Sequence, residues 1–246
     1  MAGISILPIV GLPEVGPGDD LARQIYDAGA GFEAGDILVV TQRVVSKAEG
    51  RLVDLGSVNP SPLASNFARR WEKDARLVEL VLQESRRIVR MERGIIISET
   101  HHGLVCANAG IDASNVVGES VVCLLPEDPD TSAERLREGL QSLGAPSIAV
   151  VITDTFGRPW RVGQTNVAIG VAGMSPLVDY IGTRDTQGRE LRVTLIAAAD
   201  EIAGAAELVM GKVENVPAAI VRGYRFDSRA GSAAELIREP DKDLFR

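Results

Sequence analysis

Two stretches of the sequence place a carboxylate close after an apolar run, where it is available as a metal ligand. Asp154 and Thr155 follow the apolar run 147–153, and Asp112 lies among Asn, Ser and Gly residues in the stretch 107–116. Ligands of open sheets bind outside the carboxyl ends of the strands, and Mg²⁺ prefers oxygen ligands such as these. The pattern predicts a divalent-metal site at these two stretches. An Asx turn at 107–116 and a capped surface loop after Asp154 are the structural alternatives.

Cationic side chains accompany the two acidic stretches. Lys47 lies in the segment 41–51, after another apolar run, and is a candidate counter-charge for triphosphate oxygens. Arg158 and Arg161 flank Trp160, and the planar guanidinium fork suits a carboxylate or a phosphate group. A solvated charge cluster at 41–51 and surface arginines at 158–161 are the alternatives. Together with the carboxylates, these groups are the parts of a metal–triphosphate site.

The familiar nucleotide-binding and hydrolase motifs are absent from the sequence. It contains no GxxxxGK[ST] loop, no GxGxxG after a strand, no HExxH and no GxSxG. Asn115, near Asp112, is a candidate donor to a phosphate or ribose group. Phosphoryl transfer asks a protein mainly for positioning and charge neutralisation. We therefore expect an enzyme that uses a divalent metal and a nucleoside triphosphate without the common loops.

Short strands and helices alternate along the chain and must position these groups. This order favours an α+β or α/β protein without clearly separable domains. Strands are expected at 4–10, 36–41, 94–98, 104–107, 147–153 and 218–221. Helices are expected at 19–30, 61–92, from 130 onward, at 197–210 with Gly211 as its C-terminal cap, and near 233–237. A charged bend is expected at 44–51 and a polar loop at 154–166.

Composition narrows the class of protein further. The chain has 246 residues, of which 45% are hydrophobic and 24% charged, as is usual for globular proteins. A net charge of −8 argues against nucleic acid as a partner, because non-specific binding to phosphate needs a cationic surface. No apolar run approaches the roughly 20 residues of a membrane span, and the N-terminus resembles a strand rather than a signal peptide. We expect a cytoplasmic protein that binds no membrane.

The cysteines and histidines are interpreted as structural. Cys106 and Cys123 lie in apolar runs, which is typical of core thiols in a reducing compartment. His101 and His102 are adjacent, so their side chains point apart on a strand and rarely bind one metal. A turn role is favoured for the pair, with substrate contact and metal binding as alternatives.

Several long motifs in a fixed order resemble the F420-0:gamma-glutamyl ligase family, whose members are coenzyme F420:L-glutamate ligases. The resemblance covers essentially the whole chain. It rests on the segments 11–13, 45–51, 108–116, 152–158, 199–203 and 217–223. It implies an α+β fold of an unusual two-part type, with residues 1–246 forming one unit of two interwoven subdomains in an intertwined homodimer. The chain resembles the stand-alone form of the family, without a C-terminal reductase-like domain.

The resemblance also implies a reaction and a set of site residues. The reaction is GTP-dependent addition of L-glutamate to F420-0, a 5-deazaflavin, with further γ-linked glutamates, through an acyl phosphate. It requires Mg²⁺ or Mn²⁺, two ions being expected, with K⁺ as an additional candidate. The implied metal ligands are Asp112, Asp154 and Thr155, with Glu207 and Glu214 as candidates for a second ion. The implied GTP contacts are Leu12, Pro13, Glu14, Val15, Gln42, Lys47, Asn115, Met210, Gly211, Lys212 and Val213, within a stretch that extends to Val216. The groups expected to act in catalysis are Asp112, Asp154 and Arg158, and Arg158 or Arg161 is expected to hold a substrate carboxylate.

Two other functions use the same residues. A metal-dependent nucleotide phosphohydrolase would present the same carboxylates to a water molecule instead of a carboxylate acceptor. A non-catalytic GTP-binding protein would hold the nucleotide without turning it over. The ligase and both alternatives require Asp112 and Asp154 to lie close together in the folded chain.

Overall fold

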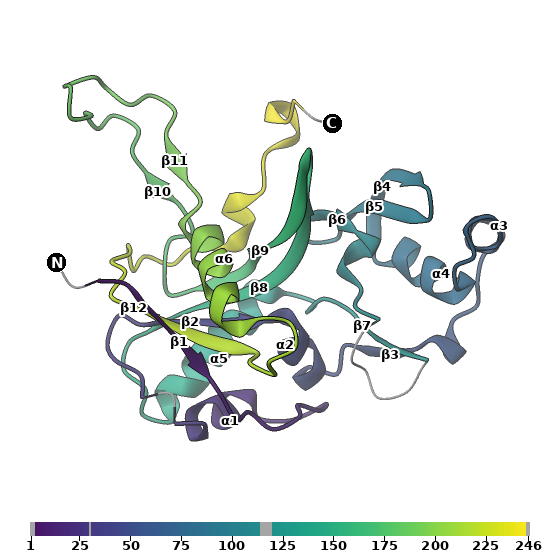
Figure 1. Cartoon of the computed structure of the whole chain (residues 1–246), viewed down its shortest axis with the longest axis horizontal. Coiled ribbons are helices and arrows are strands. Elements are labelled where there is room, and N and C mark those ends of the chain that lie inside the picture. Colours follow the sequence, from purple (N-terminus) through teal and green to yellow (C-terminus); the bar gives the residue numbers. More distant parts are fainter. Residues whose placement is uncertain (1–2, 30, 114–119, 245–246) are drawn as a thin grey trace.

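A five-stranded mixed sheet lies at the centre of the structure, a computed structural model that describes residues 3–29, 31–113 and 120–244 (Figure 1). Strands β2 and β8 pair in parallel, and the other neighbouring strands of this sheet pair antiparallel. In spatial order the strands are β1 (Ser5–Ile9), β12 (Ala218–Arg222), β2 (Ile37–Thr41), β8 (Ala149–Arg158) and β9 (Arg161–Ala172).

Helices cover both faces of this sheet. Leu38 and Val40 of β2 belong to one apolar cluster and Ile37 and Val39 to another, as the alternation of side chains along a strand requires. Both faces of β2 are therefore buried, which explains its continuous apolar run. Helices α1 (Leu21–Asp27) and α5 (Pro129–Ser142) pack on the first face, and α6 (Ala198–Met210) packs on the second.

Residues 52–113 and 120–123 lie beside the sheet, and most of the residues of two further apolar clusters belong to them (Figure 1). They form a two-stranded sheet of β3 and β7 and a three-stranded antiparallel sheet of β4, β5 and β6. The elements are β3 (Leu52–Asp54), a 3₁₀ turn (Leu55–Ser57), α3 (Pro62–Trp71), α4 (Ala75–Gln83), β4 (Ser85–Glu92), β5 (Ile95–Thr100), β6 (Val105–Ala107), a 3₁₀ turn (Asn108–Gly110) and β7 (Val121–Cys123). The α+β class is thus confirmed, whereas the interwoven subdomains and the dimer stay predictions.

Two hairpins project from the sheet on the same side of the molecule (Figure 1). One is the outer half of β8 and β9, which continues beyond the strands that flank it. The other is the long connection that carries the short pair β10 (Val178–Asp179) and β11 (Leu195–Ile196). The chain ends in two 3₁₀ turns, Ala233–Leu236 and Pro240–Lys242. Among the residues described, no helix combines the length and the apolar character needed to cross a membrane.

Three expectations about local structure were wrong. The helix predicted for 61–92 is broken between α3 and α4 and ends at Gln83, and Ser85–Glu92 forms β4 instead. Pairing with β5 in a tight hairpin supplies the hydrogen bonds of this arginine-rich strand, whose side chains lack the apolar alternation by which a strand is usually recognised. The bend predicted for 44–51 is helix α2 (Gln42–Ala48), in which Ser46 Oγ donates to Gln42 Oε1.

The polar loop predicted for 154–166 is in fact the β8–β9 hairpin. Thr155 pairs with Asn166 and Arg158 with Arg161, and the turn at Trp160 has a positive φ of 56°. Its outer part is exposed on both sides, so the side chains there lack the apolar alternation by which a strand is usually recognised.

Candidate functional site

A cavity of about 740 Å³ opens where the parallel pairing of β2 and β8 ends. The last parallel register pair is Thr41 with Thr153. After Thr41 the chain turns into α2, and after Thr153 it continues as the β8–β9 hairpin. The cavity is lined by Leu12, Pro13, Glu14, Val15, Thr41, Gln42, Arg43, Val44, Lys47, Asp112, Thr153, Asp154, Thr155, Asn166, Gly211, Lys212, Val213, Asn215, Val216 and Pro217.

A bulge in the hairpin sets the position of Asp154. The register between β8 and β9 shifts between Ile152 and Thr153, opposite Gly170 and Ala168. Asp200, in the first turn of α6, accepts a hydrogen bond from the backbone N–H of Ala168 at 2.8 Å. Bulges bend a strand and re-aim its side chains. Asp200, interpreted from sequence as a helix-dipole residue, therefore also fixes the strand opposite Asp154.

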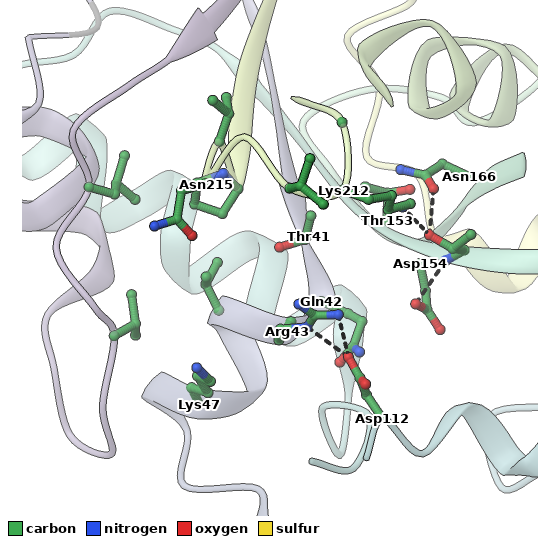
Figure 2. A pocket seen from close by; sticks show the side chains of 18 of the residues that line it. Thr41, Gln42, Arg43, Lys47, Asp112, Thr153, Asp154, Asn166, Lys212 and Asn215 are labelled. Atoms are coloured by element: carbon green, nitrogen blue, oxygen red, sulfur yellow. Dashed lines mark hydrogen bonds and ion pairs between the residues drawn. The ribbon is translucent and has the colours of Figure 1, made fainter. Parts of the chain in front are cut away.

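Asp112 reaches the cavity from a different part of the chain. Its backbone exchanges two hydrogen bonds with Cys123, both of 2.9 Å, directly after the 3₁₀ turn Asn108–Gly110. Its Oδ2 accepts from Arg43 Nε at 2.7 Å and lies 2.6 Å from Arg43 Nη2 (Figure 2). The side chain is thus held in place by α2, which carries Arg43.

Asp112 and Asp154 face the same cavity, as the sequence-based hypothesis required (Figure 2). The pKa of Asp154 is raised to about 6, chiefly by burial and also by the nearby negative charge of Asp112. A hydrogen bond from the backbone N–H of Thr155 and the positive charges of Lys212 and Arg43 act in the opposite direction. The two carboxylates therefore interact electrostatically, and the ionised form of Asp154 is disfavoured unless another cation approaches.

Lys47 forms the opposite wall of the cavity. Its side chain comes from the last turn of α2, and the residue as a whole is only 8% exposed. Its Nζ forms an ion pair with Oε1 of Glu14, whose side chain is 72% exposed. A buried ammonium paired with an exposed surface carboxylate can exchange that partner for a ligand anion at little cost.

Four side chains close a ring of hydrogen bonds on the far side of Asp154. Thr155 Oγ1 donates to Asn166 Oδ1 at 2.8 Å, and Asn166 Nδ2 donates to Glu207 Oε2 at 2.8 Å. Lys212 Nζ lies 2.7 Å from Glu207 Oε1 and donates to Thr155 Oγ1, also at 2.7 Å. Every polar group of the ring has a matching donor or acceptor, so the ammonium is held at the cavity wall.

The groups around the two aspartates fit one hard divalent cation. Both carboxylates supply oxygen, the donor type that Mg²⁺ and Mn²⁺ prefer. Within the described part of the chain, the buried hydroxyl of Thr153 has no hydrogen-bond partner, although it lies in the cavity wall. Among the same residues, no three or more His, Cys, Asp or Glu side chains are grouped so that they could hold a metal ion together.

Most of the residues expected to form the site line this cavity. They are Leu12, Pro13, Glu14, Val15, Gln42, Lys47, Asp112, Asp154, Thr155, Gly211, Lys212 and Val213. Met210 does not, because its side chain is buried in the core beneath α6. Arg158 lies at the tip of the hairpin, outside the lining, and donates to the backbone carbonyls of Val162 and Gly163. Asn115 lies outside the described residues.

Several lining residues were not singled out from the sequence. They are Thr41, Arg43, Val44, Thr153, Asn166 and Pro217, with Asn215 and Val216 in the stretch expected to contact nucleotide. Thr41 and Arg43 flank Gln42, which was expected to contact GTP, so their position in the sequence is the signal that could have identified them. Asn166 had no such signal, because its role depends on a hairpin that the sequence did not reveal.

The cysteines and histidines lie outside the lining of this cavity. Cys106 and Cys123 are buried and unpaired, as predicted, and burial raises the pKa of Cys106 to about 12. His101 contacts the backbone carbonyl of Gln83, and His102 contacts that of Pro126. These contacts support the turn role for the pair.

The fold and the cavity define an α+β protein whose site combines two carboxylates with several cations, an arrangement suited to a metal-bound polyanion. The family model described as F420-0:Gamma-glutamyl ligase matches residues 10–223, and the chain belongs to this family. A relative from Methanothermobacter thermautotrophicus, named coenzyme F420:L-glutamate ligase, is 47% identical over 99% of both chains. Relatives of the same name come from Methanopyrus kandleri, 47% identical over the whole of both chains, and from Archaeoglobus fulgidus, 43% identical over 99% of this chain and 96% of its own.

Proposed function

We propose that this protein is a ligase that joins L-glutamate to coenzyme F420-0, using GTP and a divalent metal. Family membership and relatives of this name along the full chain support the substrates. The observation that carries the metal and the nucleotide is the cavity itself. It brings Asp112 and Asp154 together with three cationic side chains, Arg43, Lys47 and Lys212.

The size and charge of the cavity suit a nucleoside triphosphate. A volume of about 740 Å³ lies within the usual range of small-molecule sites. Lys47 and Arg43 come from one helix and Lys212 from a separate turn, so the three cations approach a ligand from different sides (Figure 2). Lys47 is placed to meet phosphate oxygens once it leaves Glu14. Leu12 and Pro13 offer an apolar surface to the base or ribose.

In the proposed reaction the terminal carboxylate of F420-0 attacks the γ-phosphorus of GTP. A new O–P bond forms, the bond to the β-phosphate oxygen breaks, and GDP leaves. The amine of glutamate then attacks the acyl carbon of this acyl phosphate, and inorganic phosphate leaves while the amine loses a proton. A bound Mg²⁺ or Mn²⁺ would neutralise charge on the phosphoryl oxygens. Asp112 and Asp154 would hold that ion, and Lys47 would orient the phosphates.

Other parts of the proposal rest on the amino-acid sequence or on the family resemblance alone. They are the use of K⁺, the addition of further γ-linked glutamates, the contact of Asn115 with the nucleotide, the substrate-carboxylate role of Arg158 or Arg161, the cytoplasmic location, and the homodimer of two interwoven subdomains. Each is separately measurable, and the dimer is tested by sedimentation equilibrium.

One assay tests the central proposal. The purified chain is incubated with F420-0, GTP, Mn²⁺ and L-glutamate, and the deazaflavin is analysed by mass spectrometry. We expect the mass of F420-0 to rise by one glutamyl residue, with GDP and phosphate formed in equal amount. Asp154→Asn should abolish the product, while Asp241→Asn, at an exposed carboxylate in the last 3₁₀ turn, should leave it unchanged.

Other outcomes of the assay would identify a different function. Phosphate release that is unaffected by omitting F420-0 and glutamate would indicate a nucleotide phosphohydrolase. Tight GTP binding without any product would indicate a non-catalytic GTP-binding protein. Product formation with no added nucleotide would rule out the acyl-phosphate route.

A further inference from the structure

The ring formed by Thr155, Asn166, Glu207 and Lys212 bears on how many metal ions the site holds. Thr155 was expected to ligate a metal, and Glu207 was a candidate ligand of a second ion. In the structure the Thr155 hydroxyl already donates to Asn166 and accepts from Lys212. Both oxygens of Glu207 are occupied as well, one by Asn166 and the other by Lys212.

The remaining acidic candidate does not reach the cavity. The carboxylate of Glu214 folds back onto its own turn, where Oε2 accepts from the backbone N–H of Val213 at 3.0 Å. Gly211 has a φ of 61° and a ψ of −166°, a backbone conformation that favours glycine, so this turn depends on the glycine at its start. The turn therefore directs Lys212 toward the cavity and Glu214 away from it.

We infer that the ammonium of Lys212 takes the place of a second metal ion, so that the site uses one divalent ion on Asp112 and Asp154 beside a built-in positive charge. This inference rests on the proposed function and replaces the sequence-based expectation of two ions. A divalent ion bound to the Thr155 hydroxyl at about 2.1 Å would lie less than about 5 Å from Lys212 Nζ. Like charges at that distance repel, although the 55% exposure of the Lys212 side chain screens part of the repulsion.

The surroundings of the ring explain why the ammonium stays at this position. Asn166 is 2% exposed, and its amide orientation is set by its two partners on either side. Because Asn166 donates to Glu207, that carboxylate is turned toward Lys212. The result is a fixed donor beside Asp154, which is where a phosphoryl oxygen of a metal-bound triphosphate would need charge compensation. A fixed ammonium provides this without depending on the concentration of a second ion.

Metal counting tests the inference independently of turnover. Mn²⁺ bound per chain is measured by equilibrium dialysis with a non-hydrolysable GTP analogue, and the bound ions are examined by electron paramagnetic resonance. We expect one ion per chain and no spin coupling between ions in the unmodified protein. Lys212→Glu removes the ammonium and adds a carboxylate, so we expect a second ion in that variant. Lys242→Glu, at an exposed lysine near the C-terminus, is the matched control and should remain at one.

Lys212→Arg preserves the charge and should keep the count at one ion. Two ions per chain in the unmodified protein would overturn the inference, and so would a single ion in Lys212→Glu. The glutamate-addition assay is scored separately. Normal product with two bound ions refutes the role of Lys212 while the ligase function stands, whereas one ion without product refutes the ligase function alone.

Discussion

Replacing Asp154 by asparagine should stabilise the metal-free protein while removing its activity. Burial among β8, β9 and the cavity wall disfavours the ionised carboxylate, and its pKa rises from an ordinary 3.8 to about 6. At about 1.36 kcal/mol per pH unit, this difference corresponds to about 3 kcal/mol of stability lost when the group is fully ionised. Partial exposure to the cavity makes this an upper limit. An asparagine keeps an oxygen for the hydrogen bond from Thr155 N and carries no charge.

The pH dependence distinguishes this cause from a general packing effect. Between pH 4 and 6 the folded protein binds more protons at Asp154 than the unfolded chain does, so the stability of the unmodified protein falls as pH rises through this window. Below pH 4 both states are protonated, and Asp154→Asn should match the unmodified protein. Above pH 7 the variant should be more stable by up to about 3 kcal/mol, or roughly 6–12 °C in Tm for a chain of this length.

Thermal unfolding in the presence of a chelator, followed by circular dichroism from pH 4 to 8, measures this difference. Adding Mn²⁺ at pH 7.5 should raise the Tm of the unmodified protein but not that of the variant, because only the former holds the ion. Asp241→Asn, at an exposed carboxylate, should follow the unmodified protein at every pH. A stability difference that does not change with pH, or a variant that is stabilised by Mn²⁺ as strongly as the unmodified protein, would refute this reasoning.

Three further predictions concern the cations. Lys47→Met should weaken GTP binding roughly 10–100-fold, as expected for loss of a charge-assisted hydrogen bond, with little change in Tm; calorimetric titration measures the affinity. Arg158→Ala should leave the Kd for Mn²⁺–GTP unchanged, because its guanidinium binds carbonyls of its own hairpin outside the cavity; a large loss of affinity would place it in the nucleotide site. Arg222→Met should lower the free energy of unfolding by about 3 kcal/mol, since it leaves the 1%-exposed Asp36 without its paired charge. Urea denaturation measures this loss. The affinity for GTP at low temperature should be preserved.

The strands that carry the site were predictable because their signal is local. The apolar runs of β2 and β8 are buried on both faces, and such runs are recognisable from composition. Helix α6 was equally clear, with Gly211 at its C-terminal end. Since β2 and β8 are parallel neighbours, the residues that follow them meet at one edge. Local sequence indicated the two strands, whereas their parallel pairing, between segments far apart in the chain, is a finding of the structure.

The features that the sequence did not reveal depend on pairing between segments, either within a polar hairpin or across the fold. The β8–β9 hairpin joins residues whose polar character resembles that of a loop, and β4 becomes a strand only because β5 pairs with it. The ring around Lys212 links positions on three elements, and the ion pair of Arg43 with Asp112 spans 69 residues of sequence. Such contacts have no period or spacing from which they could be inferred.

The site is a set of ion pairs that a metal-bound triphosphate would rearrange. Arg43 pairs with Asp112, Lys47 with Glu14, and Lys212 with Glu207. A ligand that brings both a divalent cation and phosphate oxygens offers each member of the first two pairs a new partner of opposite charge. The carboxylate of Asp112 would turn to the metal, and the cations to the phosphates. Because charges already paired are exchanged rather than newly desolvated, the cost of burying them is largely met before binding. A nucleotide without metal would give new partners only to the cations, and a metal alone only to the carboxylates. We therefore expect the metal and the nucleotide to bind cooperatively.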